Sequence, residues 1–183
     1  LDILRPTRGT LRVLGATSAL EVRNRIGYLP EEKGLYRKMK ASTLIAHFAS
    51  LKGMRLGDAH RRALELLAQY GLRDFANSRA EQLSKGMGQK VQVLAAIAHD
   101  PELVILDEPF SGLDPVNQSV LEDVINDLRA RGRTVVFSTH VMQHAERLCD
   151  HLVILGGGRK LFDGTVAAAR QTLPLRIRLQ TGD

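Results

Sequence analysis

The stretch LVILDEPFSGLDP, Leu103 to Pro115, decides the interpretation of the fold. Four apolar residues run directly into two acids, Asp107 and Glu108. A short apolar run rich in branched side chains predicts a buried strand. Two acids at the end of such a strand cost free energy unless a cation or hydrogen bonds compensate their charge. The stretch therefore predicts a strand that carries a polar site at its carboxyl end.

Two further apolar runs follow along the chain, TVVFS (134–138) and LVIL (152–155). Helical patterns separate them, one from Pro115 to Leu128 and another over residues 141–148. Strands that alternate with helices predict an α/β fold with a mostly parallel sheet, joined by right-handed crossovers and covered on both faces. The tripeptide GGG after the third run, followed by RKLFDG, predicts a hairpin at the edge of the sheet.

Upstream of this stretch the pattern is mostly helical. Apolar residues recur at helical spacing in three segments, which we expect to begin at Ser42 or Thr43, at Asp58, and after Gly86. Together they predict a partly separate helical lobe over residues 40–98.

The first thirty residues carry a different pattern. GTLRVLG (9–15) and RIGYLP (25–30) predict short extended segments between turn residues. The opening residues LDILRPTRG (1–9) have the pattern of a helix end that runs into a turn, with no capping residue ahead of the apolar positions. We interpret this start as a chain cut inside a domain.

The composition excludes some classes of function. The 183 residues carry a net charge of +6, with 17 Lys or Arg against 8 Asp or Glu in residues 1–90. A basic half is compatible with nucleic acid, acidic lipid or phosphate ligands, but aromatic residues make up only 4%, too few for stacking platforms that bind single-stranded nucleic acid. No apolar run approaches the roughly 18 residues of a membrane span. We therefore expect a soluble protein, and the single Cys149 fits a reducing cytoplasm.

Two acids and a histidine follow the predicted strands at their carboxyl ends, where open parallel sheets bind ligands. Asp107 can hold Mg²⁺ directly or through water, and Glu108 can orient and deprotonate an attacking water. His140, which ends the segment FSTH, can donate a hydrogen bond to a terminal phosphate. Taken alone, these residues are equally compatible with solvated acids and a histidine that caps a helix.

The segment QLSKGMGQKVQ (82–92) places a serine and a glycine at the start of an amphipathic helix. The free N–H groups and the dipole of such a helix start favour an anion, to which Ser84 can donate a further hydrogen bond. Ser84 is equally suited to cap the helix, and Asp114 before Pro115 is expected to cap the helix that follows. A capped start and a phosphate contact are compatible.

In their order along the chain, LSKGM, LVILDEP, SGLDP and STH resemble the signature, Walker B, D-loop and switch-histidine segments of the ATP-binding cassette of ABC transporters. IGYLPEEKGLY resembles the loop that joins the nucleotide core to the helical lobe. The resemblance covers essentially the whole chain. It implies a P-loop NTPase-like parallel sheet core with a helical signature subdomain, and ATP and Mg²⁺ as ligands.

The resemblance also implies roles for individual residues. Glu108 matches the catalytic carboxylate, Asp107 the magnesium-side acid and His140 the switch histidine at the γ-phosphate. Ser84 and Gly86 match signature positions that contact the γ-phosphate of ATP held by the opposite subunit.

Asp114 matches the D-loop acid that crosses the dimer interface. Glu31 stands where the joining loop usually has Gln, so it can bind Mg²⁺ or water but cannot donate the hydrogen bond of an amide. Lys85 and Met87 occupy the third and fifth places of a signature that is usually LSGGQ. These variants resemble a branch of exporter ATPases that partner a separately encoded permease.

No G-x-x-x-x-G-K-[ST] segment, the Walker A phosphate loop, is present in these residues. In the family this loop precedes a helix and then a turn that RPTRG (5–9) matches. The resemblance therefore implies a chain that begins about one helix after the loop, and we expect these residues alone neither to bind ATP tightly nor to hydrolyse it.

The resemblance implies a domain plan and partners. We expect a remnant of the nucleotide-binding core, the helical subdomain, the remainder of the core and the start of a C-terminal extension, in residues 1–39, 40–98, 99–172 and 173–183. The expected partners are a second ABC ATPase subunit and a membrane permease, with no nucleic acid. The expected location is the cytoplasm, peripheral at the inner face of the cell membrane through the permease.

Two other functions stay open at this level. One is a soluble cassette ATPase that acts on nucleic acid or ribosomes, although the interval between Glu31 and Ser84 is too short for the coiled coil of repair members and lacks its heptads. The other is a regulatory domain without catalysis, against which the presence of Glu108 and His140 argues.

Overall fold

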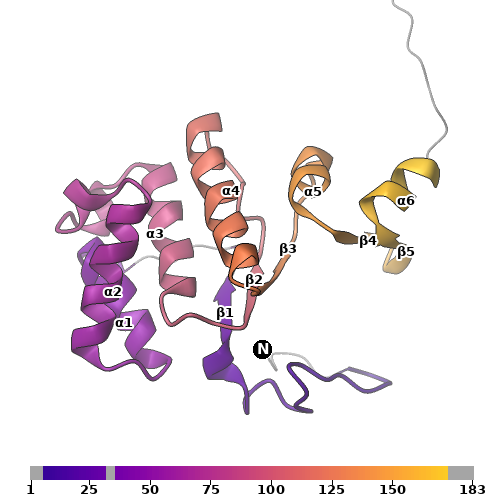
Figure 1. Ribbon diagram of the computed structural model, residues 1–183, viewed down its shortest axis with the longest axis horizontal. Helices are drawn as coiled ribbons and strands as arrows, with labels where there is room; N and C mark the ends of the chain where they lie inside the picture. The colour runs from indigo at the N-terminus through magenta and orange to yellow at the C-terminus, as the bar shows by residue number, and fades with distance from the viewer. Residues whose placement is uncertain (1–5, 32–35, 173–183) are drawn as a thin grey trace, which may run out of the picture. The chain divides into compact units, whose positions relative to one another are not determined.

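The computed structural model describes residues 6–31 and 36–172 (Figure 1). The chain forms two compact units, residues 1–139 and residues 140–183, which are treated separately below. The expected helix end within residues 1–5, part of the joining loop at residues 32–35, and the expected extension at residues 173–183 lie outside the described residues.

The first unit is built on three parallel strands, β1 (Ile26–Leu29), β2 (Leu103–Leu106) and β3 (Thr134–Phe137). They lie in the order β1-β2-β3, and Leu106 pairs with Leu29 on one side and with Phe137 on the other. The predicted parallel α/β core is confirmed, and each apolar run that was expected here forms a strand.

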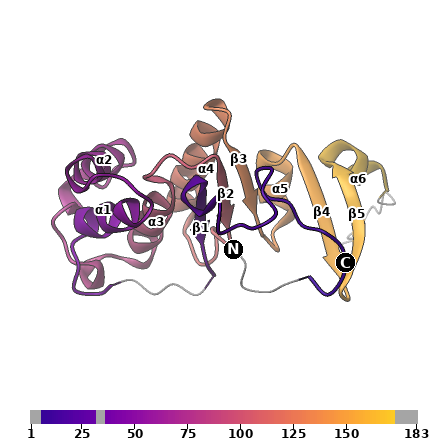
Figure 2. The same cartoon turned by 90° about the horizontal axis from the view of Figure 1, so that it is seen from below.

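Helices α3 (Lys85–Ile97) and α4 (Pro115–Ala130) cover one face of this sheet. The connection from β1 to β2 and the connection from β2 to β3 run in the same direction across the sheet. Because both are right-handed, their helices lie on the same face (Figure 2). Beneath them Val104 and Leu106 are fully buried. Val104 and Leu106 alternate along β2, so both side chains lie on the face of the sheet that the helices cover.

The opposite face is covered by residues 13–22. Ala19 and Val22 pack with Ile26, and Leu103 and Ile105 border the same cluster. The expected strand at residues 9–15 is wrong: Val13 and Ala16 form only an isolated bridge, because Leu14 and Gly15 have positive φ angles of 51° and 84° and reverse the chain.

Residues 41–97 form a helical region whose last helix, α3, contacts β1 (Figure 1). It consists of α1 (Ala41–Leu51), α2 (Leu56–Gln69) and the start of α3, with one-turn helices η2 (Arg73–Phe75) and η3 (Ala80–Gln82) in the connection. Its core is formed by large apolar side chains that are under 2% exposed: Leu44, Ile45, Leu66, Leu67, Leu94 and Ile97. Burial on this scale accounts for the compactness of the lobe.

All three expected helix starts are displaced, and α3 begins at Lys85 and not after Gly86. Helix α1 begins at Ala41 and not at a Ser or Thr cap, because the backbone carbonyls of Ser78 and Ala76 accept its first N–H groups, those of Ala41 and Ser42. Helix α2 begins two residues before Asp58, whose carboxylate instead forms an ion pair with Arg61 at 2.6 Å in the first turn.

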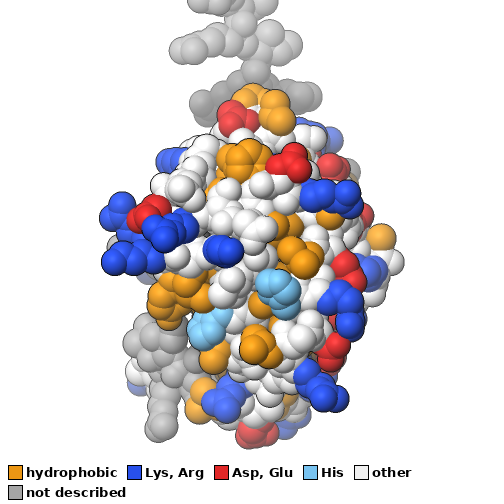
Figure 3. Space-filling view, turned by 90° about the vertical axis from the view of Figure 1, so that its left-hand side faces the viewer, with side chains coloured by type: hydrophobic (Ala, Val, Ile, Leu, Met, Phe, Trp, Pro, Cys, Tyr) orange, Lys and Arg blue, Asp and Glu red, His pale blue; other side chains and the backbone are white. Residues whose placement is uncertain are grey.

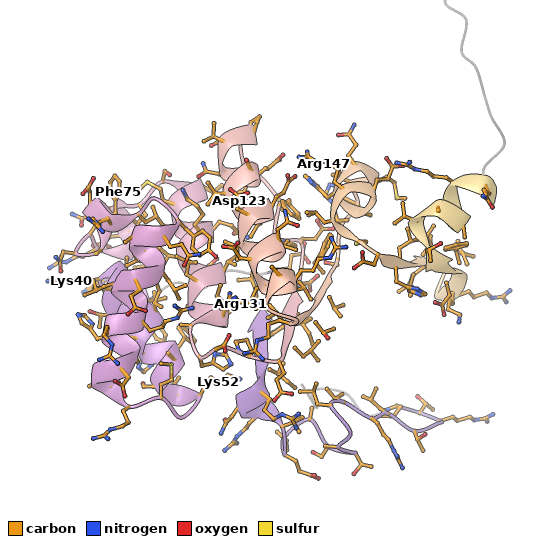
Figure 4. The ribbon with its side chains drawn as sticks, in the orientation of Figure 1. Lys40, Lys52, Phe75, Asp123, Arg131 and Arg147 are labelled. Atoms are coloured by element: carbon orange, nitrogen blue, oxygen red, sulfur yellow. The ribbon has the colours of Figure 1, made fainter. Side chains whose placement is uncertain are left out.

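The amino edge of the sheet carries charged side chains that pair within the chain; Lys52 and Arg131, which lie near this edge, are labelled in Figure 4. The one-turn helix η1 (Arg23–Arg25) precedes β1, and Arg25 donates two hydrogen bonds to Glu102, at 2.6 and 2.7 Å. Lys52, at the end of α1, donates to the carbonyl oxygens of Arg23 and Ile26 at 2.7 and 3.0 Å.

Asp100 lies at the same edge and accepts ion pairs from Arg131 and Arg133. The half-buried ring of His99 contacts the Ile26 carbonyl through Nε2 at 3.3 Å. Burial, reinforced by the positive charge of Lys52, lowers the pKa of His99 to about 4. This imidazole is therefore neutral at physiological pH.

The second unit contains α5 (Met142–Leu148), β4 (His151–Gly156), β5 (Arg159–Thr165) and α6 (Val166–Thr172). Strands β4 and β5 form the predicted hairpin, which turns at two glycines with positive φ, Gly157 and Gly158. In the described residues this hairpin is a separate two-stranded sheet and not the edge of the parallel sheet. Over the described ranges, no helix has the length and apolar character needed to span a bilayer.

Candidate active site

The carboxyl ends of the three parallel strands meet at one edge of the sheet. The N–H of Asp107 donates to the carbonyl of Leu29 at 2.9 Å, and the N–H of Ser138 donates to the carbonyl of Leu106 at 3.0 Å. These bonds continue the ladders one residue past the strand ends. They bring together residues that are about 30 to 80 positions apart in the sequence.

The two acids predicted at this edge are held by a serine. Ser138 Oγ lies 2.6 Å from Asp107 Oδ1 and 2.8 Å from the backbone nitrogen of Glu108. The amide N–H can only donate, so the serine hydroxyl proton is directed at the carboxylate. One hydroxyl thus connects the end of β3 to both acids that follow β2.

Glu108 has a left-handed backbone conformation, with φ of +43°. A glutamate in this region costs free energy and persists only where surrounding contacts enforce it. Gln89, 4% exposed on α3, donates from Nε2 to the carbonyl of Pro109 at 2.8 Å, and the N–H of Ser111 donates to the carbonyl of Glu108 at 3.2 Å. The loop after β2 is therefore fixed on both sides of Glu108.

Glu31 lies at the same edge, two residues beyond the last residue of β1, and is exposed. Because Leu29 at the end of β1 bonds to Asp107, the chain after β1 leaves the sheet next to the two acids. This position agrees with a ligand role for Glu31, which stays a prediction.

The predicted start of the signature helix has the expected cap. Ser84 Oγ accepts a hydrogen bond from the N–H of Met87 at 3.2 Å, and Gly86 is buried in the first turn of α3. A Cβ added at Gly86 would lie 2.5 Å from Asn117 Nδ2. A side chain at this position would therefore have to displace the Asn117 amide from its place beside the first turn of α3.

The D-loop acid also has the expected cap. Asp114 Oδ1 accepts from the N–H of Asn117 at 2.9 Å, and Asp114 Oδ2 accepts from Asn117 Nδ2 at 2.6 Å. These hydrogen bonds lower the pKa of Asp114. Pro115 occupies the first position of α4. Asp114 is therefore ionised at neutral pH, and its carboxylate is fixed at the helix start.

Lys85, the unusual residue of the signature segment, extends toward the D-loop of its own chain. A Cβ at Gly112, whose φ is +69°, would meet the Lys85 ammonium group. Through this contact, and through the approach of Gly86 to Asn117, the signature and D-loop segments pack against each other.

His140 is the first residue of the second unit. The first unit therefore brings Asp107 and Glu108 together with the end of β1. It also brings the helix caps at Ser84 and Asp114 close to each other. The place of His140 in the site stays a prediction.

Two residues of this region were not predicted. Ser138 belongs to FSTH, in which only the histidine was assigned a role, and Gln89 lies in the helix after the signature. A signal for Gln89 exists, because it is an uncharged polar residue on a helix turn otherwise filled by buried residues such as Val93. The role of Ser138 depends on strand register, for which the sequence offers no signal.

The donor set at this edge fits a hard divalent cation that other ligands complete. Asp107 supplies carboxylate oxygens, and no Lys or Arg side chain of the described residues forms an ion pair with it. Across residues 6–31 and 36–172 no group of three or more His, Cys, Asp or Glu forms a closed metal cage. Mg²⁺ is usually held by one or two carboxylates together with waters and substrate phosphates, which matches this arrangement.

Comparisons with known proteins agree with the motifs. The family model described as ABC transporter matches residues 1–111. The chain is 41% identical over 172 residues to the uncharacterized ABC transporter ATP-binding protein YhaQ of Bacillus subtilis (strain 168), covering 94% of this chain and 58% of YhaQ. It is 33% identical over 169 residues to the ABC transporter ATP-binding protein NatA of the same organism, covering 90% of this chain and 69% of NatA.

A solved structure of the ATP binding subunit of an ABC transporter has a TM-score of 0.82 and 34% identity to this chain, covering 93% of this chain and 72% of the other. The chain spans about three fifths of the length of YhaQ. On the family match, the identities and the shared fold, the chain belongs to the ATP-binding subunit family of ABC transporters.

Proposed function

We propose that the full gene product containing these residues hydrolyses ATP at a cassette dimer and couples hydrolysis to export through a membrane permease. The observation that supports this most is the Asp107–Glu108 pair at the carboxyl edge of the sheet, held by Ser138 and with no Lys or Arg of the described residues paired to Asp107. A carboxylate that is held in place but has no Lys or Arg partner among the described residues is suited to bind a cation that comes from outside the chain.

In this proposal Glu108 accepts a proton from the water that attacks the terminal phosphate. Its backbone is fixed by Ser138 and by the Pro109–Gln89 hydrogen bond, so the carboxylate starts from a defined position. Asp107, and Glu31 from the neighbouring strand end, would hold Mg²⁺. Bound Mg²⁺ would supply neutralisation of the phosphate charge.

The signature and D-loop segments are proposed to act on the nucleotide of a second subunit. Ser84 presents its hydroxyl at the start of a 13-residue helix, whose N–H groups favour an anion. Asp114 is ionised and lies beside this helix start through the Gly86–Asn117 approach. His140 is proposed to donate a hydrogen bond to the γ-phosphate.

The test is ATP turnover by the full gene product and by its Glu108→Gln variant. Gln keeps the size of the side chain but cannot accept the proton, so we expect turnover to fall about 10²- to 10⁴-fold while nucleotide binding is retained. Turnover at the wild-type rate in the variant would contradict the proposal. Residues 1–183 alone contain no Walker A segment, and we expect no turnover from them.

For the permease, we propose a docking groove between α1 and α2. The groove has a volume of about 440 Å³ and is lined by Met39, Thr43, Ala46, His47, Leu56, Gly57 and His60. Figure 3 shows the face of the lobe on which apolar atoms and two His side chains are surrounded by charged groups. Tyr36 and Phe48 stack around His47, with ring centroids 5.9 and 5.8 Å from it.

This chemistry suits a short amphipathic helix on the cytoplasmic side of the permease, which would bury its apolar face in the groove. Leu56 is 69% exposed at the groove, and Leu64, 42% exposed on the same helix, does not line it. We expect Leu56→Glu to abolish co-purification with the permease and to leave turnover of the isolated subunit unchanged. Leu64→Glu is the matched control and should keep the complex.

A further inference from the structure

We propose that Ser138 is a positioning residue for the catalytic pair, which orients the Asp107 carboxylate and fixes the backbone of Glu108 with one hydroxyl group. This inference rests on the proposed ATPase function and deepens it. Ser138 itself touches neither nucleotide nor water in the proposed reaction. Its effect is exerted entirely through the two acids.

The bonding pattern gives the hydroxyl a defined direction. It accepts from the N–H of Glu108 at 2.8 Å and donates to Asp107 Oδ1 at 2.6 Å, a length typical of a charge-assisted O–H···O⁻ bond. The donated proton occupies one oxygen of Asp107 and thereby sets the plane of the carboxylate. The second oxygen, Oδ2, is left for a ligand from outside the described residues.

The backbone of Glu108 requires such a contact. Its φ of +43° is a conformation that glutamate rarely adopts, and the accepted N–H is a contact that enforces it. Without the Ser138 oxygen, the amide loses its partner and the residue can return to an ordinary φ. That change would rotate the Glu108 side chain away from its present direction.

The other anchors of the loop cannot replace this one. Leu29 holds the N–H of Asp107, and Gln89 holds the carbonyl of Pro109, so both act on neighbouring peptide groups. Neither bonds to the Asp107 carboxylate or to the Glu108 N–H. Ser138 is the described residue that connects both acids to β3, and it therefore determines their mutual orientation.

A positioning role differs from a merely structural one in its dependence on metal. Residues that orient a metal-bound carboxylate change metal affinity about 10- to 100-fold when they are removed. Loss of fold stability would instead weaken nucleotide binding with and without metal. The distinction can be measured with a fluorescent, non-hydrolysable ATP analogue, titrated in EDTA and at increasing Mg²⁺ concentration.

The experiment compares Ser138→Ala, Ser138→Thr and Thr134→Ala in the full gene product. Thr134 is the exposed first residue of β3, so its replacement removes a hydroxyl from the same strand at the opposite edge. For Ser138→Ala we expect the Mg²⁺ concentration at half-saturation of analogue binding to rise about tenfold. Affinity in EDTA should stay within about twofold of wild type, and hydrogen exchange of the Glu108 amide should accelerate. Ser138→Thr keeps the hydroxyl and should restore both, while Thr134→Ala should match wild type.

The outcomes separate this inference from the proposed function. An unchanged Mg²⁺ dependence and unchanged Glu108 exchange in Ser138→Ala would overturn the positioning role alone, provided that the wild type hydrolyses ATP. Equal losses of affinity with and without Mg²⁺, not rescued by Thr, would show a structural role and overturn it as well. A wild-type gene product that binds no Mg²⁺–nucleotide would overturn both.

Discussion

The charged side chains at the two edges of the parallel sheet have different partners. At the amino edge, charges pair inside the chain: Arg25 with Glu102, and Asp100 with Arg131 and Arg133. At the carboxyl edge, Asp107 is bonded to a hydroxyl, with no Lys or Arg partner in the described part of the chain. Charges that pair inside the chain are already compensated, whereas the Asp107 carboxylate is oriented without such a cation among the described residues and is available to a ligand.

The largest expected effect concerns this difference directly. Asp107→Asn keeps the shape of the side chain and one acceptor oxygen for Ser138, but it removes the charge. We expect turnover of the full gene product to fall about 10²- to 10³-fold, because the proposed magnesium site loses its acid. The free energy of unfolding should change by less than about 1 kcal/mol, since no Lys or Arg of the described residues is left without its partner.

The measurement is ATP turnover alongside urea unfolding of the same samples. A large loss of stability in Asp107→Asn would show that the carboxyl edge holds the fold in the same way as the amino edge, and the contrast would be lost.

A second prediction tests the amino edge in the opposite sense. Asp100 has a φ of +54° and pairs with two arginines, of which Arg133 is only 27% exposed. Asp100→Ala leaves the Arg133 guanidinium without its partner and places Ala in a left-handed conformation, so we expect a loss of about 1–2 kcal/mol in the free energy of unfolding.

Asp100→Asn is the matched variant, because Asn tolerates this conformation and retains a hydrogen-bond acceptor. Its loss should be smaller, and turnover should stay at the wild-type level in both variants. Reduced turnover with normal stability would place function at the amino edge too.

The carboxyl edge of the sheet could be predicted from the sequence better than the amino edge. The apolar run before Asp107 and Glu108 is long enough for a strand and too short for a helix, so the position of both acids at a strand end followed from the pattern alone. The alternation of strands and helices likewise predicted the parallel core. The caps at Ser84 and Asp114 are local features, set by residues three positions away, and both were predicted.

What could not be predicted depends on contacts between distant segments. The role of Ser138 requires the register of β3 against β2, and the left-handed φ of Glu108 follows from that contact. The start of α1 was misassigned for the same reason: carbonyls of the connection after α2, including that of Ser78, satisfy its N–H groups, and no local pattern shows this. Strand register and hydrogen bonds to distant carbonyls are determined only when the fold assembles.

A third prediction concerns His99, which lies at the amino edge between the opposing charges of Lys52 and Asp100. Its folded-state pKa of about 4 is below the unfolded value near 6.5, so the unfolded chain binds the proton first as the pH falls. Stability is therefore full above about pH 6.5, decreases as the pH falls toward 4, and levels off below that value. Because solvent screens the half-buried ring, we expect the loss to be limited to about 1 kcal/mol.

This is measured as the difference in unfolding free energy between the wild type and His99→Gln across that range. The difference should be constant above pH 6.5 and should shift in favour of the variant below it. Lys52 and Asp100 act on the ring in opposite directions. A difference that stays constant to pH 4 would mean that the buried Nδ1, which has no partner among the described residues, is accessible to solvent after all.

The smallest effect is expected at the Arg25–Glu102 ion pair. Arg25 and Glu102 form two short hydrogen bonds, but both side chains are 45% exposed. The bond to Arg25 lowers the pKa of Glu102, so the stabilisation is present above its ordinary pKa and is lost as the pH falls through the lowered value. Exposed pairs contribute little and are screened by salt.

A double-mutant cycle with Arg25→Gln and Glu102→Gln should therefore give a coupling energy that is barely measurable at neutral pH and disappears in 1 M salt. A coupling that survives high salt would mean that Arg25 and Glu102 are shielded from solvent in the folded protein. The amino edge would then owe part of its stability to charge pairing, and its contrast with Asp107, which has no Lys or Arg partner in the described part of the chain, would become sharper.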